Sequence, residues 1–255
     1  MNQAELEQIN NVASTGFSDP EIEQMLKAGV HLGHAKSKNN SSMGSYIFGV
    51  RNTISVIDLL KTKEKLAPAL RFLKETALKG GMVLFVGTRP AARKIIPDIA
   101  EELGMPYFTE RWIGGTLTNF KVISKRVEYM IELERALNSG ELAKYTKWEQ
   151  MQKAVELERL KRFFNGLRAL KRLPDAVFVV DTTHDTTAVH EARKMKIPLV
   201  ALVDTNADAN KIDYPIPSND DALSAVRYMI GRIGDAIREG KNEIRGEKES
   251  ESTQV

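Results

Sequence analysis

The chain has 255 residues, of which 42% are hydrophobic and 28% are charged, and its formal net charge is +3. This length and balance predict one large globular domain, or one domain with an insertion, that buries a sizeable core. Cysteine is absent, which excludes disulfides, cysteine–zinc sites and thiol nucleophiles. No apolar run reaches the length of about 18 residues that a membrane span needs. The first eighteen residues contain Glu5 and Glu7 but no Lys or Arg, unlike a targeting peptide, so we expect a cytoplasmic protein.

The N-terminal part begins with a segment that lacks hydrophobic periodicity, residues 1–17, which we expect to be flexible. A helix should follow, because Asp19 can cap it and Pro20 suits its first position. Gly29 should end this helix. The next predicted elements are a polar loop over 35–45, strands over 46–51 and 53–58 separated by Asn52, and an amphipathic helix over 62–79.

Continuous apolar runs are the main signal in the rest of the chain. They cover residues 82–86, 176–181 and 199–204, and they are typical of strands buried on both faces of a parallel sheet. Between and after them we predict helices over 91–103 and 186–196, short strands over 107–109 and 214–216, and a last helix ending near Glu239. This alternation predicts an α/β domain over 18–239 with a doubly wound, mostly parallel sheet of the Rossmann or flavodoxin-like type. Residues 240–255 are polar and of low complexity, and we expect a disordered tail.

An insertion interrupts this pattern, and it leaves the sheet at residues 111–121. The pair Gly114-Gly115 can turn the backbone sharply, Thr116 or Thr118 can cap the helix that follows, and Trp112 should anchor the insertion in the core. Apolar residues then recur three and four apart, interrupted by Glu134 and by a break at 138–140, and Thr146 with Glu149 can form a capping box at the start of the returning helix. Residues 117–172 are therefore predicted to form a protruding antiparallel coiled-coil hairpin with arms roughly 30 Å long.

The loops after the predicted strands are where a doubly wound sheet binds a ligand. Here they are 87–90, 181–185 and 204–206, and none contains a phosphate-binding glycine motif. Asp181 and Asp204 end strands, where aspartate is more often a turn former or a helix cap than a catalytic acid. We therefore predict no catalytic residue, no cofactor and no enzyme. A nucleotide-binding α/β enzyme that uses Gly87 and Asp181 is the weaker alternative.

The four histidines form two pairs that are close in sequence, His31 with His34 and His184 with His190. The first pair has no cysteine or carboxylate at ligand spacing, and the second, in which His184-Asp185 lies near His190-Glu191, is also a weak signal for a metal site. Turn structure or RNA contact is the favoured interpretation, and no metal is predicted. If a structural metal were bound, these pairs would be the places for it.

Positive charge is concentrated in residues 151–172, which hold seven Lys or Arg side chains and two glutamates. On a helical wheel Lys161, Arg168 and Arg172 fall within about 40° of one another. Such a stripe can be the solvated face of a coiled coil, or a ridge that binds a polyanion by releasing its counterions. Both interpretations stay open from periodicity alone. Composition and motifs together indicate a binding or scaffold protein, and a cytosolic coiled-coil adaptor is a further alternative.

Several blocks, in order and with the expected gaps, resemble one family over about residues 20–240. They lie at 25–34, 46–52, 57–62, 84–88, 111–119, 173–176, 197–206 and 216–222. The family is the bacterial-type small-subunit ribosomal protein family conventionally numbered two. The resemblance implies an α/β domain with a protruding coiled-coil hairpin, a structural role in the small ribosomal subunit, and no catalysis.

The resemblance also implies partners. They are the small-subunit (16S-type) rRNA and neighbouring ribosomal proteins, including the OB-repeat protein that captures mRNA, with no membrane and no small-molecule substrate. Residues 38–43 depart from the family pattern, because they lack its usual aromatic, proline and lysine residues. With this resemblance, we predict that RNA is bound by Lys36, Lys38, Arg51, Arg89, Arg111, Asn119, Lys121, Lys161, Arg168 and Arg172.

Overall fold

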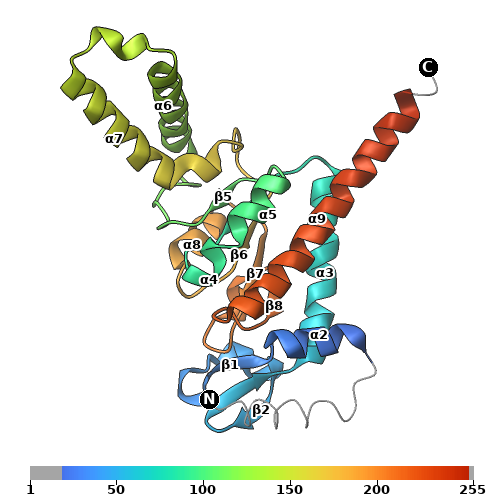
Figure 1. Ribbon diagram of the computed structural model, residues 1–255. Helices are drawn as coiled ribbons and strands as arrows, with labels where there is room; N and C mark the ends of the chain where they lie inside the picture. The colour runs from blue at the N-terminus through green and yellow to red at the C-terminus, as the bar shows by residue number, and fades with distance from the viewer. Residues whose placement is uncertain (1–18, 253–255) are drawn as a thin grey trace.

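The computed structural model describes residues 19–252, except for the side chains of residues 143, 144 and 245–252. Within that range the chain forms two sheets (Figure 1). The smaller sheet is antiparallel, with strand order β1-β3-β2, and the larger sheet is parallel, with strand order β5-β4-β6-β7-β8. The predicted flexible segment, residues 1–17, lies outside the described residues.

The parallel sheet forms the centre of the molecule. Its strands are β4 (Val83–Val86), β5 (Tyr107–Phe108), β6 (Ala176–Val179), β7 (Leu199–Val203) and β8 (Tyr214–Pro217). Every residue of β4, β6 and β7 is buried, as the continuous apolar runs predict. The strand order reverses between β4 and β6, which is the flavodoxin-like arrangement with its switch point at that place. A Rossmann-like parallel α/β sheet is thus confirmed.

Helices cover both faces of this sheet, so the domain has three layers (Figure 1). Alternate strand residues face opposite layers, with Phe85 and Phe178 on one face and Leu84 and Val179 on the other. The first face is covered by α3 (Leu59–Leu78), α4 (Pro90–Arg93), α5 (Ile96–Glu102) and α9 (Leu223–Ser252). The second face is covered by α8 (Thr186–Lys194) and the root of the helical insertion.

The small sheet comprises β1 (Leu32–Ala35), β2 (Ile47–Arg51) and β3 (Ile54–Ile57). β2 and β3 form a hairpin, and both residues of its turn, Asn52 and Thr53, have positive φ, 47° and 67°. That combination is typical of a type I′ turn, whose twist matches that of the paired strands. The sequence predicts β2 and β3, but it does not predict that they form a separate antiparallel sheet.

The segment before β2 is predicted from the sequence to be a polar loop, but it has regular structure and a buried side chain. It contains two short 3-10 helices, η1 (Lys36–Lys38) and η2 (Ser41–Tyr46), and the side chain of Met43 is completely buried. Met43 packs in the same apolar cluster as the second face of the large sheet. Met43 and hydrogen bonds from this segment, such as the one from the Asn40 amide to the Thr205 carbonyl, therefore fix it on the core.

The first helix, α2 (Pro20–Ala28), has the predicted ends. The Asp19 carboxylate accepts a hydrogen bond from the Glu21 amide, and Gly29 ends the helix at φ 79°. The predicted helix 91–103 is instead split into α4 and α5, because Pro97 stands in the first turn of α5 and cannot donate to a preceding turn.

The last helix, α9, continues to Ser252 and extends away from the body (Figure 1). The predictions that it ends near Glu239 and that a disordered tail starts at residue 240 are therefore wrong for 240–252. As far as about Glu243 the helix packs along α3, where Lys74 pairs with Glu239 at 3.4 Å and with Glu243 at 2.6 Å. Across the described residues, no helix combines the length and apolar character needed to cross a membrane.

The insertion consists mainly of α6 (Phe120–Asn138) and α7 (Lys147–Phe164), with η3 (Glu141–Lys144) between them and η4 (Asn165–Leu167) after them. The pair projects from the body (Figure 1). Gly140, at φ 76°, follows the end of α6, and Thr146 and Glu149 form the predicted capping box at the start of α7. Buried residues at their mutual contact include Val127, Met130 and Leu157. That this pair is a true coiled coil stays a prediction.

Candidate nucleic-acid interface

The junction where the helical pair leaves the sheet is organised by one buried carboxylate, Glu191 of α8. One of its oxygens accepts hydrogen bonds from the Trp112 indole at 3.1 Å and the Gly115 amide at 2.7 Å. The other accepts from the amides of Leu117 and Thr118 at 2.9 and 3.0 Å, and from the Thr118 hydroxyl at 3.1 Å. Burial by itself raises the pKa of Glu191, but these donors outweigh it and leave the pKa below its usual value.

The predicted anchor of the insertion, Trp112, is confirmed. Its side chain is buried, with its ring centre 5.2 Å from that of Phe108, and the turn beside it is completed by Gly115 at φ 92°. That backbone conformation favours glycine because it has no Cβ. Trp112 and Gly115 thus set the direction in which the insertion starts.

The predicted threonine cap of α6 is wrong. The residue at that position is Asn119, whose side chain makes no capping hydrogen bond. The Thr116 hydroxyl donates instead to the Ile113 carbonyl, and the Thr118 hydroxyl donates to Glu191. The threonines stabilise the turn before the helix rather than its first turn, and sequence spacing cannot distinguish the two roles because the carboxylate comes from a distant helix.

The ten side chains predicted to bind RNA fall into two classes. Five are exposed cations that form no ion pair with a described residue: Lys36, Lys38, Arg51, Arg111 and Lys121. The first three form a small-sheet group, since the amide of Lys36 donates to the carbonyl of Thr53 in the β2–β3 turn beside Arg51. The other two, with exposed Asn119, form a junction group at the start of α6.

The remaining four predicted cations are paired within the protein. The carboxylate of Glu134 in α6 forms ion pairs with Lys161 at 2.9 Å and with Arg168 at 2.7 Å. The pKa of Glu134 is lowered to about 2, mainly by the hydrogen bond from Arg168. Arg172 binds both carboxylate oxygens of Asp175, at 2.8 and 2.7 Å. The residue that interrupts the apolar repeat of α6 is therefore the acceptor for two cations of the facing segment.

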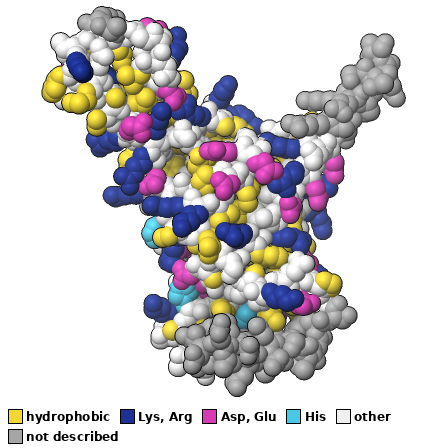
Figure 2. Space-filling model, viewed as in Figure 1, with side chains coloured by type: hydrophobic (Ala, Val, Ile, Leu, Met, Phe, Trp, Pro, Cys, Tyr) yellow, Lys and Arg dark blue, Asp and Glu magenta, His cyan; other side chains and the backbone are white. Residues whose placement is uncertain are grey.

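Arg89, the fourth paired cation, contacts Asp181 and Asp221 at the carboxyl edge of the sheet. Figure 2 shows that Lys and Arg side chains are spread over the body, many of them close to Asp or Glu, rather than gathered in one patch. Hydrophobic side chains are gathered on the outer part of the helical pair in the same view. The structure therefore brings the predicted residues together in separate groups and not in a single site.

The carboxyl edge of the sheet is poorly suited to a phosphate. A Cβ on Gly87 would lie 2.6 Å from Ala92 and Ile96, so this glycine permits close packing of the following helices and does not leave room for a ligand. Four aspartates stand at this edge, and the charged ones among them would repel an anion. We call them the acidic edge cluster: Asp181, Asp204, Asp220 and Asp221.

His34 joins the small sheet to this cluster. Its Nδ1 lies 3.0 Å from Asp204 and its Nε2 lies 3.3 Å from Asp221, and the hydrogen bond to Asp204 is the main reason why the pKa of His34 is raised. His31 does not share the site. It is buried, and burial lowers its pKa to about 4. No local signal could pair His34 with these aspartates, because they come from the opposite end of the chain.

The sequence profile of the family described as "Ribosomal protein S2" matches residues 25–240. The chain belongs to the ribosomal protein S2 family. Two similar proteins are both called "Small ribosomal subunit protein uS2" and come from two strains of Thermus thermophilus. Each is 46% identical over 223 residues, which cover 88% of this chain and 87% of the relative. The predicted family and the prediction that the protein is not an enzyme are confirmed, and the protein has a structural role in the ribosome.

The S2 family match includes both basic groups, the helical pair and the acidic edge cluster, since all lie within residues 25–240. Glu134 and Glu191 are the important residues that the sequence interpretation missed. The first looked like a defect in an apolar repeat and the second like part of a histidine pair. A carboxylate where an apolar residue is expected was the only available signal for Glu134.

Proposed function

We propose that the protein binds small-subunit rRNA in the cytoplasmic ribosome through its unpaired cations. The observation that carries this proposal is that five of the cations predicted to bind RNA are exposed and form no ion pair with a described carboxylate, in a member of a ribosomal family. Such side chains can exchange their counterions for RNA phosphates without first breaking an internal ion pair. The small-sheet group and the junction group are therefore the main proposed contacts.

The cations that are paired within the protein are proposed to make secondary RNA contacts. Lys161 and Arg168 remain partly exposed, at 32% and 35% of the side chain, so each can contact a phosphate while it stays bound to Glu134. Arg172 is exposed in a similar way beside Asp175. We propose that α6 and α7 form a coiled-coil arm. Its basic face, made of Lys161, Arg168 and Arg172, would make weaker RNA contacts than the unpaired groups.

A protein contact is proposed for the outer part of the arm. Trp148, Met151 and Val155 of α7 are 62%, 59% and 67% exposed, and their spacing places them along one side of the helix. Exposed apolar stripes of this kind are typical of surfaces that are covered by another protein. We propose that a neighbouring small-subunit protein covers this stripe. We also propose that the protein helps to dock the OB-repeat mRNA-binding protein, without assigning that contact to one surface.

The RNA proposal is tested by measuring binding to small-subunit rRNA as a function of salt. Changing Lys36, Lys38 and Arg51 to Gln should weaken binding and should reduce the slope of log K against log salt by about 2–3, at roughly 0.7–0.9 per lost phosphate contact. The matched control changes three lysines that pair with local carboxylates, Lys27, Lys65 and Lys211, and so loses the same net charge.

Equal loss of affinity in the test and control variants would show that only net charge matters, and the proposed small-sheet contact would be wrong.

A second variant reverses the charges of Lys161, Arg168 and Arg172. It is followed by sucrose-gradient sedimentation with small subunits after a moderate-salt wash. Normal incorporation of this variant would rule out the helical pair as an RNA-binding arm.

A further inference from the structure

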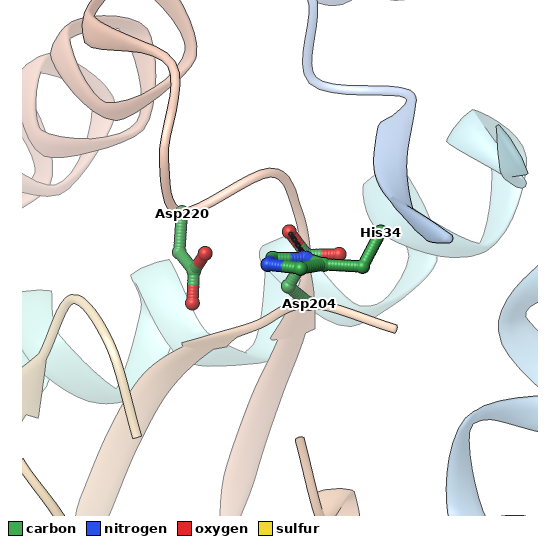
Figure 3. Close-up of side chains that lie close together, drawn as sticks. All are labelled: His34, Asp204 and Asp220. Atoms are coloured by element: carbon green, nitrogen blue, oxygen red, sulfur yellow. Dashed lines mark ion pairs between the residues drawn. The ribbon is translucent and has the colours of Figure 1, made fainter. Parts of the chain in front are cut away.

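Three side chains from distant parts of the chain converge at the carboxyl edge of the parallel sheet (Figure 3). His34 comes from β1, Asp204 follows β7, and Asp220 lies between β8 and α9. The imidazole and the two carboxylates point toward one another, and each offers one ligand atom within 4.8 Å of the others. The set is therefore assembled by the tertiary fold and not by a local motif.

Asp220 supplies the second, independent observation. Its side chain is 1% exposed, and neither carboxylate oxygen has a hydrogen-bond partner among the described residues. It does not cap α9, because the Asn219 side chain accepts the amides of Asp221 and Ala222. A buried carboxylate without a donor is costly unless a cation or a proton compensates it. Arg89 does not fill this role, since it contacts Asp181 and Asp221.

We propose that His34, Asp204 and Asp220 bind one divalent transition-metal cation, with Zn²⁺ as the cation to test. One imidazole nitrogen and two carboxylate oxygens form a ligand set that suits zinc, whereas magnesium and calcium prefer oxygen ligands alone. Bonds of about 2.0–2.2 Å place zinc ligands roughly 3.2–3.6 Å apart, so a small inward rotation of these side chains is sufficient. Water completes the coordination.

The surrounding residues fit this assignment. The backbone amide of His34 donates to the Thr205 hydroxyl at 2.9 Å, which fixes β1 next to the strand end that carries Asp204. A Cβ on Gly33 would lie 2.5 Å from the same threonine, so this close approach requires glycine. The cation would cross-link the small sheet to the carboxyl ends of β7 and β8, with a structural and not a catalytic role.

The experiment uses the full-length protein after treatment with EDTA and removal of the chelator. Isothermal titration with ZnCl₂ should give one site per chain, and Zn²⁺ at about 100 times its Kd should raise the Tm by about 5–10 °C. Asp220→Asn and His34→Gln should each weaken Zn²⁺ binding at least tenfold. The control is His190→Gln, which removes an exposed histidine outside the cluster and should leave binding unchanged.

Two results would overturn the proposal. One is a wild-type protein that neither binds Zn²⁺ stoichiometrically nor gains thermal stability from it. The other is an unchanged Zn²⁺ affinity in folded Asp220→Asn, with folding verified by circular dichroism. If Asp220→Asn instead raises the Tm and the wild type ignores Zn²⁺, a proton rather than a metal compensates Asp220, and the metal assignment is wrong.

Discussion

At the scale of single residues, two carboxylates connect the helical insertion to the rest of the protein. Glu191 accepts hydrogen bonds from the turn that begins the insertion. Glu134 joins α6 to Lys161 and Arg168 of the facing segment through ion pairs. Both have a pKa below the usual value because donors surround the charged form. Their charge is therefore part of the structure of the junction and of the arm.

Glu191→Gln should destabilise the protein by about 2–3 kcal/mol, measured as the free energy of unfolding in urea at pH 7. The amide keeps one acceptor oxygen but turns an NH₂ group toward the amides of Leu117 and Thr118, which then lose their partner. Thr118→Val serves as the comparison, since it removes one hydroxyl donor to Glu191 with little change of side-chain volume and should cost less. Equal stability of wild type and Glu191→Gln would contradict the proposed importance of this carboxylate.

Glu134→Gln should cost on the order of 1 kcal/mol at pH 7, because the ion pairs are partly exposed to solvent. The folded-state pKa is about 2, below the ordinary value of 4.5, so the charged form is the one that folding favours. Its contribution is complete above about pH 4.5 and is lost as the pH falls toward 2.

The measurement for Glu134 is the difference in unfolding free energy between wild type and variant across that pH range. Glu132→Gln is the control, an exposed glutamate of the same helix with no ion pair among the described residues. The difference should shrink toward zero as the pH approaches 2. A difference that is constant with pH would mean that Glu134 acts through packing and not through its charge.

At the scale of elements, two of the glycines of α9, Gly231 and Gly240, have opposite surroundings. A Cβ on Gly231 would meet nothing within 4 Å, whereas a Cβ on Gly240 would clash with the Lys74 carbonyl and lie 3.0 Å from the Ala77 side chain. Gly240 is therefore the position at which α9 can approach α3 closely. This contact explains why the helix continues past the point where composition predicts a disordered tail.

Gly231→Ala should stabilise the protein by roughly 0.5–1 kcal/mol, because alanine reduces the backbone entropy lost in a helix. Gly240→Ala should destabilise it by about 1–3 kcal/mol, because the added methyl group forces α9 away from α3. Both are measured by thermal unfolding of the full chain. Similar effects of the two substitutions would show that helix propensity, and not contact with α3, decides the stability of this segment.

The predictions that succeed at this scale depend on signals close together in sequence. The Asp19 cap, the Gly29 end, the capping box before α7 and the buried strands all follow from neighbours within a few residues. The acidic edge cluster could not be predicted in this way, because Asp204 and Asp220 each look like an ordinary turn residue. Only the parallel sheet, which brings all strand ends to one edge, places them beside His34.

At the scale of the whole molecule, the root and the outer part of the helical pair have different relations to the core. Leu117, Ile123, Phe164 and Leu167 belong to the apolar cluster on the sheet, while the outer part exposes Trp148, Met151 and Val155. The insertion is thus not a separate module attached at one point. Its root completes the second face of the domain.

Replacing residues 131–154 with a short Gly-Asn turn should cost about 3 kcal/mol, a fall in Tm of about 6–12 °C, because it removes the buried Leu133 and the Glu134 ion pairs, and it should leave unfolding cooperative. The pair can be shortened there because Tyr129 and Glu156 face one another, with 3.1 Å between hydroxyl and carboxylate. Deleting all of 117–172 is the comparison, and it should prevent cooperative unfolding because part of the core is removed. A larger loss than this in the shorter deletion would show that the outer arm stabilises the domain.

The position of Glu191 also has a consequence for the order in which the protein assembles during its synthesis. Gly115 and its acceptor are 76 residues apart in the sequence. At roughly 5–20 residues per second, the chain waits about 4–15 s between making the turn and making the carboxylate that holds it. Both helices of the pair are complete before that time, so we expect the arm to form first as a local hairpin. It acquires a fixed direction only when α8 folds onto the sheet.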